Sequence, residues 1–284
     1  MTTAEQWTSP LADHGEGPLW DRRSDSLLWL DMLAGDVLRC SDHGAVSRAH
    51  VGTTVAAVRP RTCGGFVLAL ERSFALTDES LTVVESLAPM WTGPDVRLNE
   101  GGCDPQGRFY AGSMAYDGRP SAGAVYRLDH DLSVSVVLPS ATVANGLAWS
   151  PDGTIAYFID SATHRLDSFE FDPAGGTLGQ RGTVVRIPDA VGTPDGLCVD
   201  ADGGLWVALW GGHAVHHYSP GGDLLDVIDV PVSGVTACTF GGPAMDQLFI
   251  TTSRLARDNP EPEAGSVFRA TPGTHGSQPH QFAR

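Results

Sequence analysis

One short pattern recurs six times along the chain: a turn rich in Asp and Gly, then an apolar or aromatic stretch that often ends in a small or polar residue. The six copies are DRRSDSLLWLD (21–31), RPRTCGGFVLA (59–69), DPQGRFYAG (104–112), SPDGTIAYFID (150–160), DADGGLWVA (200–208) and GGPAMDQLFIT (241–251). Asp-Gly turns supply the positive φ that tight hairpins need, and the stretches after them are rich in β-branched, aromatic and leucine residues. The pattern therefore predicts β-hairpins through the whole chain.

The spacing of the copies predicts the architecture. Aligned on their central apolar residues, the copies lie 38 to 48 residues apart, with a mean of 44. The aligned residues are Trp29, Val67, Tyr110, Phe158, Trp206 and Phe249. Further strand-like segments follow the later copies: AVYRLDH (124–130), SVSVVLPS (133–140), LDSFEFDP (166–173), AVHHYSP (214–220), LLDVIDVP (224–231) and SVFRATP (266–272). Serial four-stranded units with this period are typical of a β-propeller.

We therefore predict an all-β, six-bladed β-propeller with four antiparallel strands per blade. The alternative, two stacked β-sandwiches, needs a linker, and no Pro/Ser-rich or highly charged stretch interrupts the middle of the chain. We expect a single domain over residues 1–284. Strand-like sequence begins near residue 16 and continues past residue 268, so we expect the last blade to contain strands from both termini.

A second regularity lies five residues before four of the turns. Glu16, Asn99, Asn145 and Asp195 precede Asp21, Asp104, Ser150 and Asp200 by the same interval. Glycine directly follows three of the four, and Asn99 is followed by Glu100 and then Gly101. The corresponding residues of the other two units are Ala56 and Thr236. These positions begin the strand before each turn, which is predicted to line the propeller axis.

Equivalent positions on inner strands form a ring around a propeller axis. Two carboxylates and two amide carbonyls suit a hard divalent cation, Ca²⁺ first, with Zn²⁺, Mn²⁺ or Mg²⁺ as alternatives. The glycines would let backbones approach closely at the crowded axis. The simpler interpretation is that Asn-Gly and Asp-Gly are only turn dipeptides. The coincidence of four positions, one of them a glutamate, favours the metal ring.

Charge and cysteine content limit the partners and the compartment. The chain carries 18 basic and 34 acidic residues, and this net charge of −16 argues against nucleic acid and anionic membranes as partners. Its five cysteines include no CxxC pair, which predicts buried thiols in a reducing compartment instead of a disulfide framework. The N-terminal residues have neither the basic nor the apolar region of a secretion signal. We expect a cytoplasmic protein that is a monomer or a weak dimer.

The same residues carry a family resemblance. The sequence resembles the SMP-30/gluconolactonase/regucalcin-like family of six-bladed propellers. The matching stretches are GEGPLWD (15–21), RLNEGGCDPQGRFYAGSM (97–114), NGLAWSPDGTIAYFIDS (145–161), PDGLCVDADGGLWVALWGG (194–212) and CTFGGPAMDQLFITTSR (238–254). They cover most of the chain in the family's order.

The resemblance implies a divalent-metal-dependent hydrolase that opens sugar-acid lactones such as glucono-, xylono- or arabinonolactone. It implies metal ligands at Glu16, Asn145 and Asp195, and substrate contacts at Arg97 and Asn99. Asp117 matches an acidic position that binds sugar hydroxyls in some members. Three positions depart from the family pattern: Glu100 replaces the usual Asp, His217 replaces a frequent Arg, and His14 replaces a common Leu.

Elementary chemistry assigns roles to these residues. A divalent ion polarises an ester carbonyl and lowers the pKa of water, and Asp195, a carboxylate beside it, is the candidate general base. Arg97 stays protonated and can donate hydrogen bonds to hydroxyls or to a developing carboxylate. Two other functions remain open: a calcium-binding regulatory protein without catalysis, and a metal-dependent aryl ester or organophosphate hydrolase. Arg97 beside Asn99 argues against the first, because a pure metal site needs no arginine.

Overall fold

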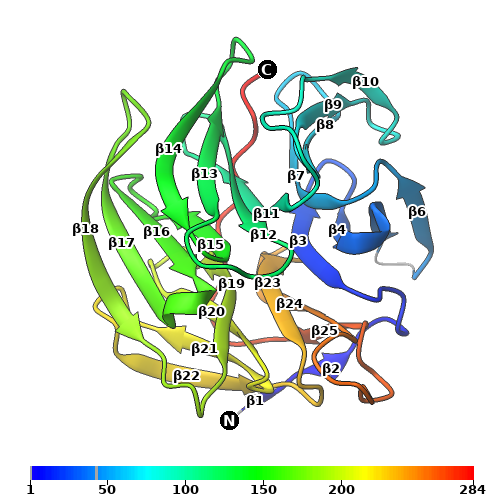
Figure 1. Ribbon diagram of the computed structural model, residues 1–284. Coiled ribbons are helices and arrows are strands. Elements are labelled where there is room, and N and C mark those ends of the chain that lie inside the picture. The colour runs from blue at the N-terminus through cyan, green and yellow to red at the C-terminus, as the bar shows by residue number, and fades with distance from the viewer. Residues whose placement is uncertain (1, 42–43) are drawn as a thin grey trace.

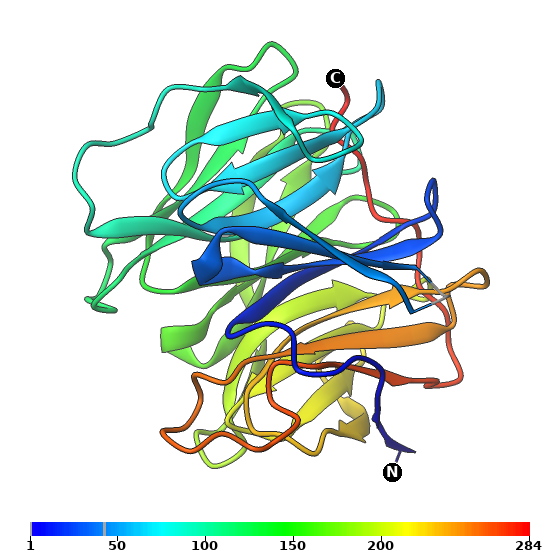
Figure 2. The same ribbon diagram turned by 90° about the vertical axis from the view of Figure 1, so that its right-hand side faces the viewer.

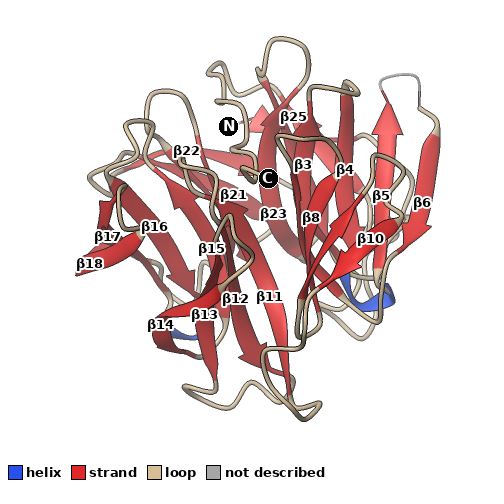
Figure 3. Cartoon of the chain, turned by 90° about the horizontal axis from the view of Figure 1, so that it is seen from above, coloured by secondary structure: helices blue, strands red, loops and turns tan. Residues whose placement is uncertain are grey.

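Six β-sheets surround a central axis in the computed structural model, which describes residues 2–41 and 44–284 (Figure 1). We number the sheets as blades 1 to 6 in chain order. Apart from the strands, the described residues form only two short 3₁₀ helices, η1 (Met32–Ala34) and η2 (Ser161–Thr163) (Figure 3). The predicted all-β, six-bladed propeller is confirmed.

The blades follow the sequence units. Blade 1 holds β3 (Gly15–Asp21), β4 (Ser26–Asp31), β5 (Asp36–Ser41) and β6 (Val46–His50), and blade 2 holds β7 (Val55–Pro60), β8 (Phe66–Leu70), β9 (Phe74–Thr77) and β10 (Val83–Ser86). Blade 3 holds β11 (Val96–Cys103), β12 (Phe109–Ala115), β13 (Gly123–Leu128) and β14 (Val134–Ala141), and blade 4 holds β15 (Ala144–Trp149), β16 (Ile155–Asp160), β17 (Arg165–Asp172) and β18 (Thr177–Arg186). Blade 5 holds β19 (Thr193–Val199), β20 (Leu205–Trp210), β21 (Ala214–Tyr218), β22 (Leu224–Asp229) and β1 (Thr2–Thr3), and blade 6 holds β23 (Val235–Gly241), β24 (Gln247–Thr252), β25 (Val267–Ala270) and β2 (Glu5–Gln6).

Both termini contribute to ring closure. The N-terminal strand β2 pairs antiparallel with β25, so blade 6 contains strands from both ends of the chain, as expected (Figure 2). Blade 5 corrects the prediction of four antiparallel strands in every blade, because β1 adds a fifth strand that runs parallel to β22. The addition covers the outer edge of blade 5, which would otherwise expose unpaired backbone groups.

The Asp that opens the repeated turns has a local structural role. The Oδ1 atom of Asp104 accepts hydrogen bonds from the backbone N–H groups of the second and fourth residues after it, at 3.0 and 2.8 Å. Asp200 makes the same pair of contacts, at 3.0 and 2.7 Å. Each carboxylate thus holds its own hairpin turn closed through contacts within four residues.

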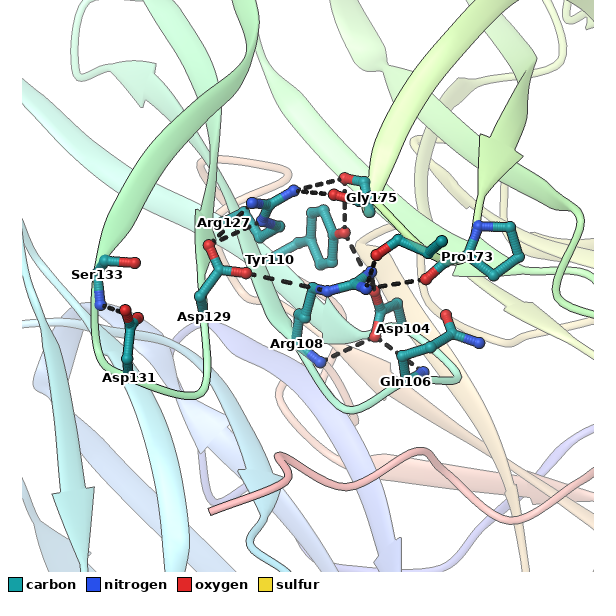
Figure 4. Close-up of polar contacts among 12 residues, drawn as sticks. Asp104, Gln106, Arg108, Tyr110, Arg127, Asp129, Asp131, Ser133, Pro173 and Gly175 are labelled. Carbon is teal, nitrogen blue, oxygen red and sulfur yellow. Dashed lines mark hydrogen bonds and ion pairs between the residues drawn. The ribbon is translucent and has the colours of Figure 1, made fainter.

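The Asp104 turn also joins blades 3 and 4 (Figure 4). Its second oxygen, Oδ2, accepts hydrogen bonds from Arg108 Nη1 at 2.8 Å and from the Tyr110 hydroxyl at 3.1 Å. Arg108 Nη2 then donates to the carbonyl oxygens of Pro173 and Ala174, both at 2.8 Å. Because those carbonyls belong to the β17–β18 turn, one buried carboxylate supports a contact between neighbouring blades.

The second strand of each blade forms the core between the sheets. The six residues on which the repeat was aligned all lie on these strands and are no more than 2% exposed. Aromatic pairs cross the interfaces between blades: the indole of Trp20 in blade 1 stacks on Phe249 of blade 6, with ring centroids 5.4 Å apart. Buried aromatic pairs of this kind stabilise the packing of one sheet on the next.

The first strands of the blades, β3, β7, β11, β15, β19 and β23, line the axis and contact one another in a closed order. At the ends of these strands where the Asp turns lie, all six blades and residues 277–280 line a cavity of about 200 Å³. The C-terminal segment is held there by Phe282, which is fully buried and donates its N–H to the Pro60 carbonyl at 2.8 Å. The C-terminal segment therefore forms part of the wall at this end of the channel.

The five cysteines are spread over the blades and form no disulfide bond among the described residues. The prediction of buried thiols is wrong for Cys63, which is exposed in the β7–β8 turn, and Cys198 is only half-buried. The Sγ atoms of Cys198 and Cys238 lie 3.6 Å apart without a disulfide bond. Within residues 2–41 and 44–284, no helix has the length and apolarity needed to span a membrane.

Candidate metal and substrate site

The six positions predicted to surround the axis all lie near the starts of the inner strands. We call this set the axial ring: Glu16, Ala56, Asn99, Asn145, Asp195 and Thr236. In every blade the pairing of the inner strand with its neighbour slips at the ring residue or directly after it. An extra residue in a strand forms a bulge that redirects side chains. A bulge at the same place in all six blades explains how the ring residues depart together from ordinary strand alternation.

The glycines after the ring residues permit close packing of the inner strands. A Cβ atom at Gly146 would lie only 2.5 Å from Cβ of Leu197 on the next inner strand. At Gly196 it would lie 2.5 Å from Cβ of Ala237. No larger residue fits either position without moving the neighbouring blade, which confirms the reason expected for these glycines.

Three oxygen-bearing side chains of the ring are brought together. Glu16, Asn145 and Asp195 are buried, with 3%, 6% and 8% of their surfaces exposed. The Asn145 Nδ2 atom donates to Asp195 Oδ1 and, at 3.1 Å, to the hydroxyl of Ser161. Its carbonyl oxygen, Oδ1, is buried and has no hydrogen-bond partner. An unsatisfied buried carbonyl is unusual, and a bound cation would satisfy it.

The electrostatics of the site also favour a cation. Burial raises the pKa of Glu16 well above its ordinary value, and the charges of Asp195 and Glu100 raise it further. Burial and then the charge of Glu100 likewise raise the pKa of Asp195 well above its ordinary value. Carboxylates that repel one another in a buried site are stabilised by a positive ion between them. Without that ion, protons are held more tightly than in water.

The donor set fits a hard metal ion. Among the described residues, no three His, Cys, Asp or Glu side chains form a group that could hold a metal. The metal ligands that the protein supplies in this site would therefore be the two carboxylates of Glu16 and Asp195 and the amide oxygen of Asn145. An all-oxygen set is what Ca²⁺ and Mg²⁺ prefer, whereas zinc sites usually include nitrogen or sulfur.

Arg97 and Asn99 form a second, connected group. Arg97 Nη1 donates to Asn99 Oδ1 at 2.7 Å, and Asn99 Nδ2 donates to the carbonyl of Ala144 at 2.9 Å. The Arg97 guanidinium, in a residue only 7% exposed, also lies 5.7 Å from the ring centroid of Tyr116. Arg97 forms no ion pair with any described carboxylate. Burial lowers its pKa, and interactions with Tyr116, Glu16 and Asp195 oppose that shift. The structure thus holds a buried, positively charged donor close to the carboxylates.

Comparison with known proteins identifies the family. The profile of the SMP-30/gluconolactonase/LRE-like region matches residues 14–254. The chain belongs to this family. Regucalcin from Danio rerio is 34% identical over 277 residues, which are 94% of each chain. A solved luciferin-regenerating enzyme is 28% identical, with a TM-score of 0.92 over 100% of both chains. Regucalcin from Agrobacterium tumefaciens str. C58, described as calcium-binding, is 24% identical, with a TM-score of 0.90 over 100% of both chains, and supports the fold.

In this member of the SMP-30/gluconolactonase/LRE-like family, Asp117 is separate from the axial ring. Its side chain is 62% exposed, and its carboxylate accepts hydrogen bonds from Arg119 Nη1 at 3.1 and 3.2 Å. It makes no hydrogen bond or ion pair with a ring residue. Its role in binding sugar hydroxyls stays a prediction, and the structure brings only Arg97 and Asn99 of the proposed substrate residues next to one another.

Three residues that lie beside the axial ring or Arg97 had no role assigned from the sequence. Ser161 positions the Asn145 amide, and Tyr116 covers Arg97. Glu100 is a third buried carboxylate, and its Oε1 accepts the N–H of Gly101 at 2.9 Å. Burial raises its pKa, while the charge of Arg59 opposes the rise. The sequence indicated Ser161, Tyr116 and Glu100 only through their positions within or beside the repeated motifs. The neighbouring residues did not indicate which side chains these three contact.

His14, which directly precedes the Gly-Glu-Gly motif, is a fourth residue near the site with no role assigned from the sequence. Its Nδ1 lies 2.9 Å from the hydroxyl of Ser253, and its imidazole meets the edge of Trp210 with ring centroids 6.0 Å apart. Burial, and then the charge of Arg97, lower the pKa of His14 to about 4. The side chain is therefore neutral at neutral pH. The 200 Å³ cavity lies at the other end of the inner strands and is lined by none of the ring residues.

Proposed function

We propose that this protein is a divalent-metal-dependent lactonase that opens sugar-acid lactones to aldonic acids. The observation that carries the proposal is the unsatisfied Oδ1 atom of Asn145, buried with two carboxylates near an arginine that has no ion-pair partner. The first part of this arrangement suits a cation, and the second suits a polar substrate. Membership of a family that includes gluconolactonases supports the same conclusion.

Glu16, Asn145 and Asp195 would hold the ion, with Asn99 beside them. When bound, a divalent cation supplies a Lewis acid for the lactone carbonyl and lowers the pKa of the attacking water. Ca²⁺ is the first candidate, because all three side chains offer oxygen.

The remaining roles belong to the side chains. Asp195 accepts the proton that water loses as it attacks the ester carbon. The ring C–O bond then breaks, and Asp195 returns the proton to the departing ring oxygen, so that the product is one hydroxy acid that carries both the new carboxyl and the new hydroxyl group. Arg97 and Asn99 donate hydrogen bonds to the hydroxyls of the substrate and orient its ring. A site built to bond hydroxyls discriminates strongly against substrates that lack them, because its buried polar groups are left unpaired.

The test is a hydrolysis panel on protein stripped of metal by a chelator. Glucono-, xylono- and arabinonolactone, an aryl ester and an organophosphate triester are each assayed with added Ca²⁺, Mg²⁺, Mn²⁺ or Zn²⁺. We expect metal-dependent turnover of at least one aldonolactone that exceeds turnover of both other classes. Calcium binding without turnover of any substrate would favour the regulatory protein, and preference for the aryl ester or triester would favour the other hydrolase.

A further inference from the structure

His14 is fixed in place by several separate elements. Its backbone N–H donates to Asp31 Oδ1 at 3.1 Å, and the residue forms an isolated antiparallel bridge with Ser253 of blade 6. The Ser253 hydroxyl, 2.9 Å from Nδ1 of His14, also accepts the N–H of Leu255 at 3.0 Å. Trp210, at the end of β20 in blade 5, packs edge-on against the imidazole. The orientation of the imidazole is therefore determined by blades 1, 5 and 6 together.

The other imidazole nitrogen is available for a ligand. Nε2 of His14 makes no hydrogen bond to a described residue, and it is not among the atoms sealed from solvent. His14 lies two residues before Glu16, and alternate residues of an extended segment project to the same side. It also lies close enough to Arg97 of blade 3 to be affected by its charge. His14 therefore lies on the same side of its strand as Glu16 and within the electrostatic reach of Arg97, with Nε2 unbonded.

Polar groups near the axial ring come from different blades. Arg97 and Asn99 come from blade 3, whereas His14 comes from blade 1 and is supported by blades 5 and 6. A ring-shaped ligand whose carbonyl reaches the axial ring would present its hydroxyls to both sides.

We propose that His14 is a specificity residue whose Nε2 hydrogen-bonds a hydroxyl of the bound sugar lactone, on the side away from Arg97 and Asn99. This inference rests on the proposed lactonase function and adds a second point of hydroxyl recognition to it. The contact is made to the substrate in its ground state as well as in the transition state. Its loss therefore raises KM more than it lowers kcat.

The experiment uses two variants that differ in which imidazole nitrogen they imitate. In His14→Asn the amide occupies the place of Nδ1, so it can keep the Ser253 contact, but nothing replaces Nε2. In His14→Gln the longer side chain reaches the Nε2 position. The matched control is His213→Asn, because His213 is bonded to Arg257 Nη2 at 3.2 Å and has a positive φ of 56° that asparagine tolerates. Thermal unfolding checks that all three variants fold.

Each metal-loaded variant is assayed on D-glucono-1,5-lactone and on unsubstituted δ-valerolactone. We expect His14→Asn to lower kcat/KM for gluconolactone about 3- to 10-fold, as for the loss of one uncharged hydrogen bond. The loss should lie mainly in KM, with δ-valerolactone unaffected and His14→Gln recovering part of the activity. His213→Asn should match the unaltered protein on both substrates.

Two results would overturn the role of His14 while leaving the lactonase proposal intact. The first is an equal loss on both lactones, which would mean that His14 only supports the site. The second is unchanged kinetics of His14→Asn on both lactones. If the unaltered protein hydrolyses no aldonolactone with any of the four metals, the lactonase proposal and the inference both fail.

Discussion

The side-chain amide of Asn145 donates a hydrogen bond to the carboxylate of Asp195 and leaves its own carbonyl oxygen buried without a partner. The contact fixes the orientation of the amide, because only Nδ2 can donate. Ser161 reinforces that orientation from the same side of the amide. The carbonyl oxygen and the two carboxylates of the axial ring are thereby prepared to share one positive ion.

Replacing Asp195 by Asn should separate its role as a base from its role as a ligand. The variant keeps the shape of the side chain but cannot accept a proton from the attacking water. We expect kcat at saturating metal to fall by about 10²–10⁴-fold, the usual contribution of a general base. Calorimetric titration establishes the metal concentration required for saturation. Turnover close to that of the unaltered protein under those conditions would show that Asp195 is not the base.

Replacing Glu16 by Gln should have opposite effects with and without metal. The folded, metal-free protein binds protons on Glu16 more tightly than the unfolded chain, because burial and neighbouring charges raise its pKa. This contribution to stability is largest in acid and is lost as pH rises from about 4, the ordinary pKa of a carboxyl, through the raised folded value. Glu16→Gln removes that dependence, so the metal-free variant should gain stability relative to the unaltered protein at pH 8 but not at pH 4.

Calorimetry or thermal unfolding measures this difference, with about 2–4 °C of Tm for each kcal/mol in a domain of this size. Saturating Ca²⁺ should reverse the order at pH 8, since only the unaltered protein gains the full free energy of metal binding. A metal-free Glu16→Gln variant that is less stable at pH 8 than at pH 4, relative to the unaltered protein, would contradict the charge repulsion inferred for the site.

Arg97→Ala should reduce the preference for hydroxylated lactones. Removal of a charged donor costs about 1.5–3 kcal/mol, so kcat/KM for an aldonolactone should fall about 10- to 100-fold. The value for a plain lactone of equal ring size should change much less, and metal affinity should stay nearly the same. Steady-state kinetics on both substrates, with metal titration alongside, provide the measurement. An unchanged preference would remove Arg97 from the substrate site.

Asp104→Ala should destabilise the fold without touching the site. Asp104 is fully buried and bonds Arg108. Its removal leaves the guanidinium, which is little exposed, with two backbone carbonyls and a longer 3.9 Å contact to Asp129. Breaking a buried pair in this way costs about 3–5 kcal/mol. Urea unfolding measures the loss, and Asp131→Ala is the matched control. Asp131 closes a comparable turn through the N–H of Ser133 at 2.9 Å, but it is exposed, so its loss should shift the midpoint far less (Figure 4). Equal losses for the two variants would contradict a role for the buried pair.

The repeated turns explain how much of the fold could be predicted from sequence. Asp104 and Asp200 act on backbone groups within four residues, so the hairpins they close are local features that are visible in the chain. The constant interval between turn and ring residue then placed Glu16, Asn145 and Asp195 at equivalent positions, because the inner strands of all blades have nearly the same length and each runs into its turn. A periodic fold converts a constant spacing in sequence into a constant position in space.

The tertiary structure decided what the ring residues and their neighbours contact. The pairing of β1 with β22 and the contact of His14 with Ser253, 239 residues away, depend on closure of the propeller and have no local signal. Asp117, whose role in binding sugar hydroxyls stays a prediction, bonds Arg119, a contact that the resemblance did not indicate. The unsatisfied carbonyl of Asn145 depends on Asp195, which comes from the next blade. Strand periodicity is encoded residue by residue, whereas side-chain hydrogen bonds across the axis depend on several blades meeting, and that occurs only when the ring closes.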